Sequence, residues 1–136
     1  MTRQEIFDKC ATHLLKQGFK CTFDKTNSTV RPGLYKRADG AACPVGILIP
    51  TNEYRYFKIA ENFPIIPVDI TLEYRSVGEI WRDNNNHLSE TTRKMLYDNM
   101  GMLIDLQNLH DKIKPSSWAD ELKKICRKWE LQWNIT

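Results

Sequence analysis

The stretch Leu34–Pro50, LYKRADGAACPVGILIP, combines a predicted β-hairpin with a short apolar helix and decides the predicted fold. Asp39-Gly40 is a dipeptide that favours a tight hairpin turn. Pro44 suits the first turn of a helix, because its missing N–H would have no partner there. Pro50 marks the expected end of that helix. The stretch therefore organises the chain, although it identifies no reaction.

A third strand completes the predicted sheet. In residues 68–75 apolar and polar side chains alternate, which is typical of a strand with one buried face. The hairpin contributes two further strands, at residues 34–37 and 41–43. The sequence therefore predicts a small antiparallel sheet made of the hairpin and one more strand.

Three main helices are expected to pack against this sheet, together with one or two short helices. The first begins at Thr2, which forms a capping box with Glu5, and ends at Gly18. The second is a long amphipathic helix over residues 89–113, and the third begins near Ser116 or Ser117. The predicted fold class is therefore α+β.

Composition indicates one folded domain. The chain has 136 residues, of which 41% are hydrophobic and 27% charged, so residues 1–136 are predicted to form a single globular domain. No apolar run has the length of a membrane span, and the amino-terminal segment is amphipathic rather than a secretion signal. We therefore expect a cytoplasmic location without membrane association. The net charge of +3 is too small to indicate nucleic-acid binding by itself.

The four cysteines, Cys10, Cys21, Cys43 and Cys126, are spread through the chain without a C-x-x-C pair. In a cytoplasmic protein of this size they are expected to be reduced thiols. Cys10 and His13 lie about one helical turn apart, but a zinc site needs two further ligands, and no recognisable spacing supplies them. We predict no metal and no cofactor.

Two residues are candidates for catalysis, and each has a structural alternative. Cys43 directly precedes a predicted helix, whose dipole lowers the pKa of a thiol. With His110 as its base, Cys43 would be the nucleophile of a hydrolase or transferase. Alternatively, Cys43 is a small buried apolar residue. His110 and Asn99, which lies three turns earlier on the same helix face, would then be satisfied by an internal hydrogen bond. The structural alternatives are favoured, so no catalytic residue is assigned.

The segment Tyr54–Phe63, YRYFKIAENF, is the strongest candidate for a binding surface. It places aromatic rings beside basic side chains, a mixture found at the centres of protein interfaces. The candidate protein-binding residues are Tyr54, Arg55, Tyr56, Phe57 and Phe63. In one alternative, the rings cover the open face of the sheet. In another, they stack on single-stranded bases, which the small basic excess argues against.

The last helix carries a basic face. Its cationic residues are expected to point outward, away from the apolar stripe, and are Lys123, Lys124, Arg127 and Lys128. Such a face can bind nucleic acid through phosphate contacts. An ordinary solvated face explains the same pattern, so nucleic-acid binding stands as an alternative function.

Four short blocks, QEIFDK, YKRADGAACPVGILIP, RSVGEIW and LQNLHD, resemble an uncharacterised family of small proteins encoded by phages and prophages. The matching positions are Tyr35, Gly40, Cys43, Gly46, Ile49, Pro50, Leu106, Gln107, His110 and Asp111. The chain departs from the family pattern by Pro44 and by a long aromatic insertion between Pro50 and Arg75. The resemblance implies a phage accessory protein and carries no activity with it.

The leading functional hypothesis combines this resemblance with the aromatic insertion. A small phage accessory protein would bind and modulate a protein of the host or of its defence system, in the host cytoplasm. The aromatic insertion would be its adjustable surface.

Overall fold

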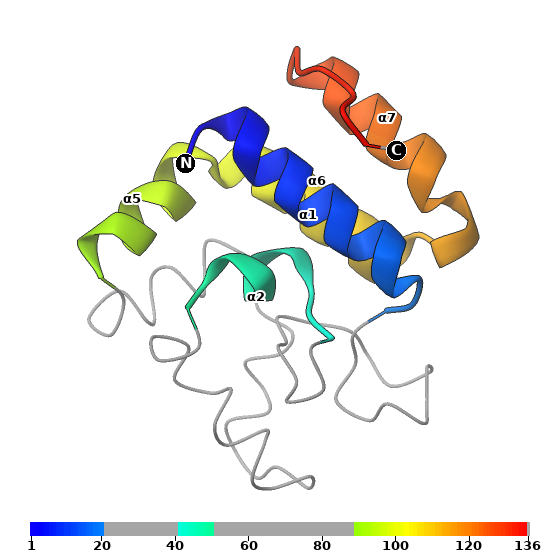
Figure 1. Ribbon diagram of the computed structural model, residues 1–136, viewed down its shortest axis with the longest axis horizontal. Helices are drawn as coiled ribbons and strands as arrows, with labels where there is room; N and C mark the ends of the chain where they lie inside the picture. Colours follow the sequence, from blue (N-terminus) through cyan, green and yellow to red (C-terminus); the bar gives the residue numbers. More distant parts are fainter. Residues whose placement is uncertain (21–40, 51–88, 136) are drawn as a thin grey trace, which may run out of the picture.

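The computed structural model describes residues 1–20, 41–50 and 89–135 (Figure 1). In chain order, their elements are α1 (Arg3–Gln17), α2 (Pro44–Leu48), α5 (Glu90–Asp98), α6 (Met100–Lys112), the 3₁₀ helix η2 (Pro115–Ser117) and α7 (Trp118–Lys128). Within these segments, no helix combines the length and the apolar character that crossing a membrane requires.

Helix α1 begins and ends where the sequence predicts. The Glu5 backbone N donates to Thr2 Oγ1 over 3.1 Å, which satisfies one amide of the first turn. Gly18 ends the helix in the left-handed region, at φ 74°, and its N–H donates to Leu14 O. Glycine has no Cβ to oppose this conformation, which accounts for the stop.

Helix α2 also begins as predicted, with Pro44 in its first turn. Cys43 is the residue before it and caps the helix through its sulfur, which accepts from Gly46 N at 3.3 Å. The helix ends at Leu48, two residues before Pro50. All of α2 except Ile47 is buried, so this short helix belongs to the core.

The α+β fold class is wrong for the part of the chain that the structure describes. That part is 73% helical and contains no strand and no sheet. At the predicted strand 41–43, Ala42 makes an isolated bridge, and its backbone N donates to Gln17 Oε1 over 2.9 Å. At residues 41–43 the described chain therefore holds a single bridge residue instead of a regular strand. Residues 34–40 and the predicted strand 68–75 lie outside the described residues.

The predicted long helix over residues 89–113 is divided in two at Asn99. This residue ends α5 and precedes α6, with φ −119° and ψ 17°. Its side-chain Nδ2 donates to Met95 O over 2.9 Å, and its Oδ1 accepts from Arg3 Nε over 3.2 Å. Asparagine side chains compete for backbone hydrogen bonds in this way, which favours a helix end over a helix interior.

Helices α1, α6 and α7 form the framework. Arg3 Nη2 donates to Asp98 O, just before α6, and Lys20 Nζ donates to Asp111 O near its end, so α1 and α6 run in the same direction (Figure 1). Helix α7 returns antiparallel to α6. The largest fully buried side chains are Trp118, Phe7, Ile6, Leu14, Ile49, Leu96, Met102, Leu103, Leu106, Leu122 and His110.

The residues after α7 run back in extended form along α1. Gln4 holds them, because its Nε2 donates to Gln132 O while its Oε1 accepts from Gln132 N, both over 2.9 Å. The Trp133 ring packs edge-on against Phe7, with centroids 6.3 Å apart. This tail therefore covers one side of α1.

Candidate functional site

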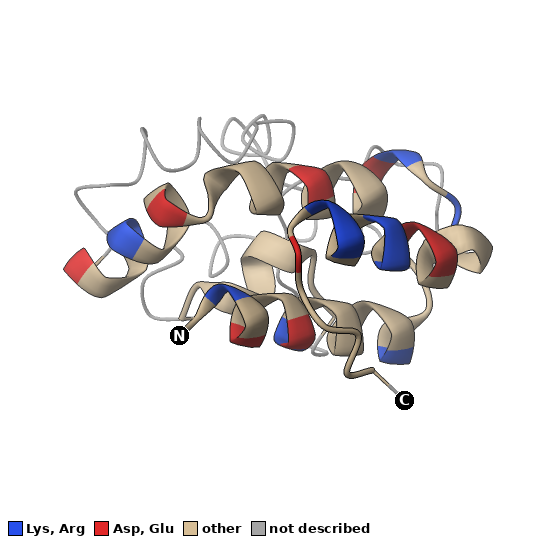
Figure 2. Cartoon of the chain, turned by 90° about the horizontal axis from the view of Figure 1, so that it is seen from above, with Lys and Arg blue, Asp and Glu red and all other residues tan. Residues whose placement is uncertain are grey.

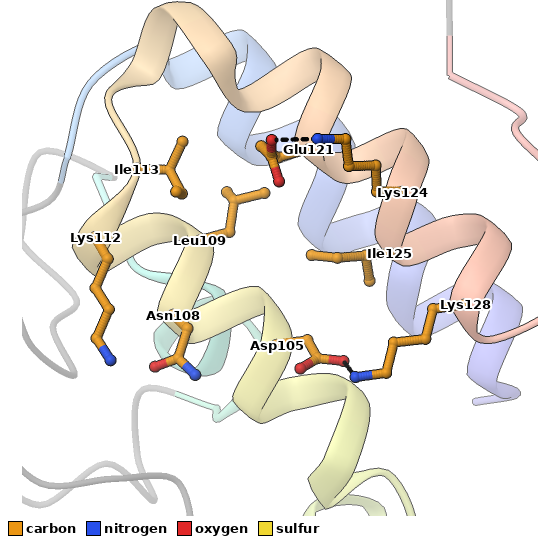
Figure 3. Close-up of a pocket in the computed structure, with 9 residues that line it drawn as sticks. All are labelled: Asp105, Asn108, Leu109, Lys112, Ile113, Glu121, Lys124, Ile125 and Lys128. Carbon is orange, nitrogen blue, oxygen red and sulfur yellow. Dashed lines mark hydrogen bonds and ion pairs between the residues drawn. The ribbon is translucent and has the colours of Figure 1, made fainter.

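A groove of about 330 Å³ lies between α6 and α7 (Figure 3). Its lining residues come from these two helices and the turn that joins them: Asp105, Asn108, Leu109, Lys112, Ile113, Glu121, Lys124, Ile125 and Lys128. The groove therefore has two helical walls, and one continuous stretch of the chain builds it.

The floor of the groove is apolar. Leu109 and Ile113 project from the end of α6, and Ile125 meets them from α7 (Figure 3). Ile113 and Ile125 are half-buried, whereas Leu109 is almost fully buried. Trp118 Nε1 donates to Ile113 O over 2.9 Å, which fixes the turn between the two walls.

One end of the groove is closed by polar contacts between the helices. Asp105 Oδ2 on α6 accepts from Trp129 Nε1 and pairs with Lys128 Nζ, both at 2.8 Å. The Trp129 ring also lies against Gly101, and the Arg3 guanidinium lies 5.1 Å from its centroid. These contacts join α6 to the end of α7 at this end of the groove.

The remaining rim carries charge on both walls. On α7, Lys124 Nζ pairs with Glu121 Oε1 at 2.9 Å, along the same helix. On α6, Lys112 and Asn108 are exposed, and within the described segments neither side chain has an ion-pair or hydrogen-bond partner. The groove thus presents an apolar floor, two internally paired carboxylates and one lysine ammonium that is available to a ligand.

The basic residues predicted on the last helix are exposed, but most of their charge is engaged. Lys124 and Lys128 make the ion pairs described above, and Lys123 Nζ lies 5.5 Å from the centroid of the Trp133 ring. Figure 2 shows acidic positions of α6 and α7 beside the basic stretch of α7. Carboxylates beside the lysines weaken attraction to phosphate, so nucleic-acid binding through Arg127 and these lysines stays a prediction.

Cys43 occupies a structural position. Its side chain has no solvent exposure, and its sulfur caps α2 by accepting from Gly46 N. Cys10 lies nearby, with its Sγ donating to Pro44 O over 3.6 Å. Burial raises the pKa of Cys10, and the neighbouring Cys43 raises it further. The structure thus places Cys43 in the core, the position expected for a small buried apolar residue.

His110 is also fully buried and does not line the groove. Its ring stacks on Trp118, with centroids 5.9 Å apart, and its Nδ1 lies 2.7 Å from Asp111 Oδ1. Asp111 Oδ1 also accepts from Gln107 Nε2 over 3.0 Å. These contacts orient the imidazole within the core, whereas the Asn99 side chain bonds Arg3 and Met95 instead.

Among the described residues, no three His, Cys, Asp or Glu side chains come together in a way that could hold a metal ion. The aromatic candidates Tyr54, Arg55, Tyr56, Phe57 and Phe63 lie outside the described residues.

Sequence reasoning did not find the groove. Its floor residues follow the apolar periodicity of core positions, and only the packing of α6 on α7 leaves them partly open.

Comparison of the chain with models of protein families, with curated proteins and with solved structures finds no match.

Proposed function

We propose that this chain is a small accessory protein that acts by binding another protein, and that the groove between α6 and α7 is a contact surface for that partner. One observation carries the proposal: an apolar floor is left partly open between two helices whose other inner residues are buried. An apolar centre surrounded by a polar rim is the usual composition of an interaction site.

The proposal is favoured over cysteine-dependent catalysis. That alternative needs an accessible thiolate beside a base, whereas Cys43 is fully buried and caps α2. His110 is fully buried as well, between Trp118 and Asp111. Neither residue lines the groove.

The resemblance to small phage- and prophage-encoded proteins indicates the kind of partner. A host or defence-system protein in the bacterial cytoplasm is the partner that such an accessory protein would modulate. The aromatic insertion would then extend the contact surface beyond the groove.

Site-specific photo-crosslinking tests this function. A benzophenone amino acid at position 108 lies on the groove rim, whereas the same residue at position 12 replaces an exposed threonine of α1 outside the groove. In bacterial cells we expect a discrete crosslinked protein from position 108 and not from position 12, and excess unlabelled wild-type protein added to a lysate should abolish it. Identical products from both positions, or none from position 108, would refute the proposal.

The aromatic segment is tested separately. The double substitution Tyr56→Ala, Phe57→Ala should weaken capture of the same crosslinked partner if the insertion contributes to binding. Unchanged capture would confine the contact surface to the groove.

A further inference from the structure

The shape of the groove indicates the class of its occupant. Sites for small molecules usually enclose most of the ligand surface. This groove is instead open along the side that faces away from the core, with a helix on each wall (Figure 3). A third helix laid between two others buries its apolar stripe in such a setting.

The length of the groove sets the length of that occupant. On α6 the lining runs from Asp105 to Ile113, which corresponds to about 12 Å of helix axis. A helix of two to three turns spans this distance, with apolar side chains at i, i+3, i+4 and i+7.

The charges around the groove indicate which charge the side chains beside the apolar stripe of the occupant should carry. Three lysines stand on the two walls, Lys112 on α6 and Lys124 and Lys128 on α7, against the two carboxylates of Asp105 and Glu121. Both carboxylates are already paired with a lysine of α7. Lys112 therefore meets an incoming anionic side chain without breaking an ion pair, whereas an incoming cation finds no unpaired carboxylate on the rim.

From this arrangement we propose that the groove binds a short amphipathic helix of a partner protein, with an apolar stripe seated on Leu109, Ile113 and Ile125 and acidic side chains facing Lys112. This inference rests on the proposed function and specifies the chemistry of the partner segment. The small open floor makes the interaction weak by itself, so the acidic flanks contribute much of the selectivity.

The same groove is poorly suited to nucleic acid. Asp105 and Glu121 stand among the rim lysines, and a phosphate backbone crossing the rim would pass beside both carboxylates. A protein helix can avoid both carboxylates by placing its acidic residues only opposite Lys112.

Two synthetic helical peptides of about 15 residues provide the probes, since shorter isolated helices are marginal in water. Both carry leucines at heptad positions a and d. One carries glutamates at e and g, and the other carries lysines at the same positions. Fluorescence anisotropy with the full chain measures each affinity at low and at high salt. We expect the acidic peptide to bind more tightly than the basic one, with a difference that shrinks as salt is added.

The protein variants Lys112→Glu and Lys16→Glu form a matched pair. Each reverses the charge of an exposed lysine in the last turn of a helix, but only Lys112 lines the groove. Lys112→Glu should weaken binding of the acidic peptide about fivefold at low salt, because it replaces an attraction by a repulsion. Lys16→Glu should change it by less than about twofold.

Three results would overturn the inference: no binding of the acidic peptide, equal affinity for both peptides, or equal effects of the two variants. The proposed function is judged independently by the crosslinks from position 108. A crosslinked partner whose contacting segment is basic or non-helical would keep the proposed function and remove this inference.

Discussion

The substitution Gly101→Ala tests the packing of Trp129 against α6 at the closed end of the groove. A Cβ built on Gly101 would lie 2.7 Å from Trp129 Cη2 and 3.1 Å from its Cζ2, both inside ordinary contact distance. The indole has little freedom to move, since its Nε1 donates to Asp105 Oδ2 and Arg3 lies against its ring.

Two opposing contributions determine how much Gly101→Ala changes the free energy of unfolding. Alanine in a helix is favoured over glycine by about 0.5–1 kcal/mol. Forcing a methyl group into a packed contact costs about 1–3 kcal/mol. The packing term exceeds the helix term, so Gly101→Ala should lower the free energy of unfolding by about 1 kcal/mol.

The same substitution in a protein that lacks the indole separates the packing contribution from the helix-propensity contribution. In a Trp129→Leu protein the indole is gone, and Gly101→Ala should then raise the free energy of unfolding by about 0.5–1 kcal/mol. Urea denaturation followed by circular dichroism measures all four proteins of this cycle. If Gly101→Ala stabilised both backgrounds equally, the described contact of Trp129 with Gly101 would be refuted.

Three further predictions concern the rest of the fold. Burial, and to a lesser extent His110, lowers the pKa of His13 despite its hydrogen bond to Gln17. The unfolded chain therefore binds more protons than the folded one, and the free energy of unfolding should fall as the pH drops below about 6.5. In urea denaturation at several pH values, His13→Gln should make the free energy of unfolding less dependent on pH, and an unchanged pH dependence would contradict this prediction. Gln4→Ala should cost about 1 kcal/mol and speed hydrogen exchange of the Gln132 amide, while unchanged exchange would show that Gln4 does not hold the tail. Cys43→Ala should cost about 1 kcal/mol more than Cys43→Ser in thermal unfolding, because only serine keeps an acceptor for Gly46 N, and the reverse order would argue against the sulfur cap.

Helix ends were predictable where their causes are local. Thr2 and Gly18 bound α1 through contacts within a few residues, and Pro44 needs only its own ring to favour a helix start. The break at Asn99 was not predictable in the same way. Its Oδ1 accepts from Arg3, 96 positions away in the chain, and the apolar stripe continues on both sides of it.

The groove was not predictable either, because it depends on tertiary packing. Periodicity places Ile113 and Ile125 on inward faces, but their partial exposure follows from the spacing of α6 and α7. Asp105 also joins the two helices through Lys128 and Trp129, and no local pattern reveals these contacts. The predicted strand at residues 41–43 was wrong: only Ala42 makes a bridge there, and Cys43 caps α2.

The most direct test of the groove as a binding surface is methyl NMR of isoleucine-labelled protein during titration with the acidic helical peptide. Ile113 and Ile125 line the groove, whereas Ile104 is exposed on α6 outside it and serves as an internal control. The δ1 methyl signals of Ile113 and Ile125 should shift saturably with peptide while that of Ile104 stays in place. Shifts at Ile104 without shifts at Ile113 and Ile125 would contradict the account.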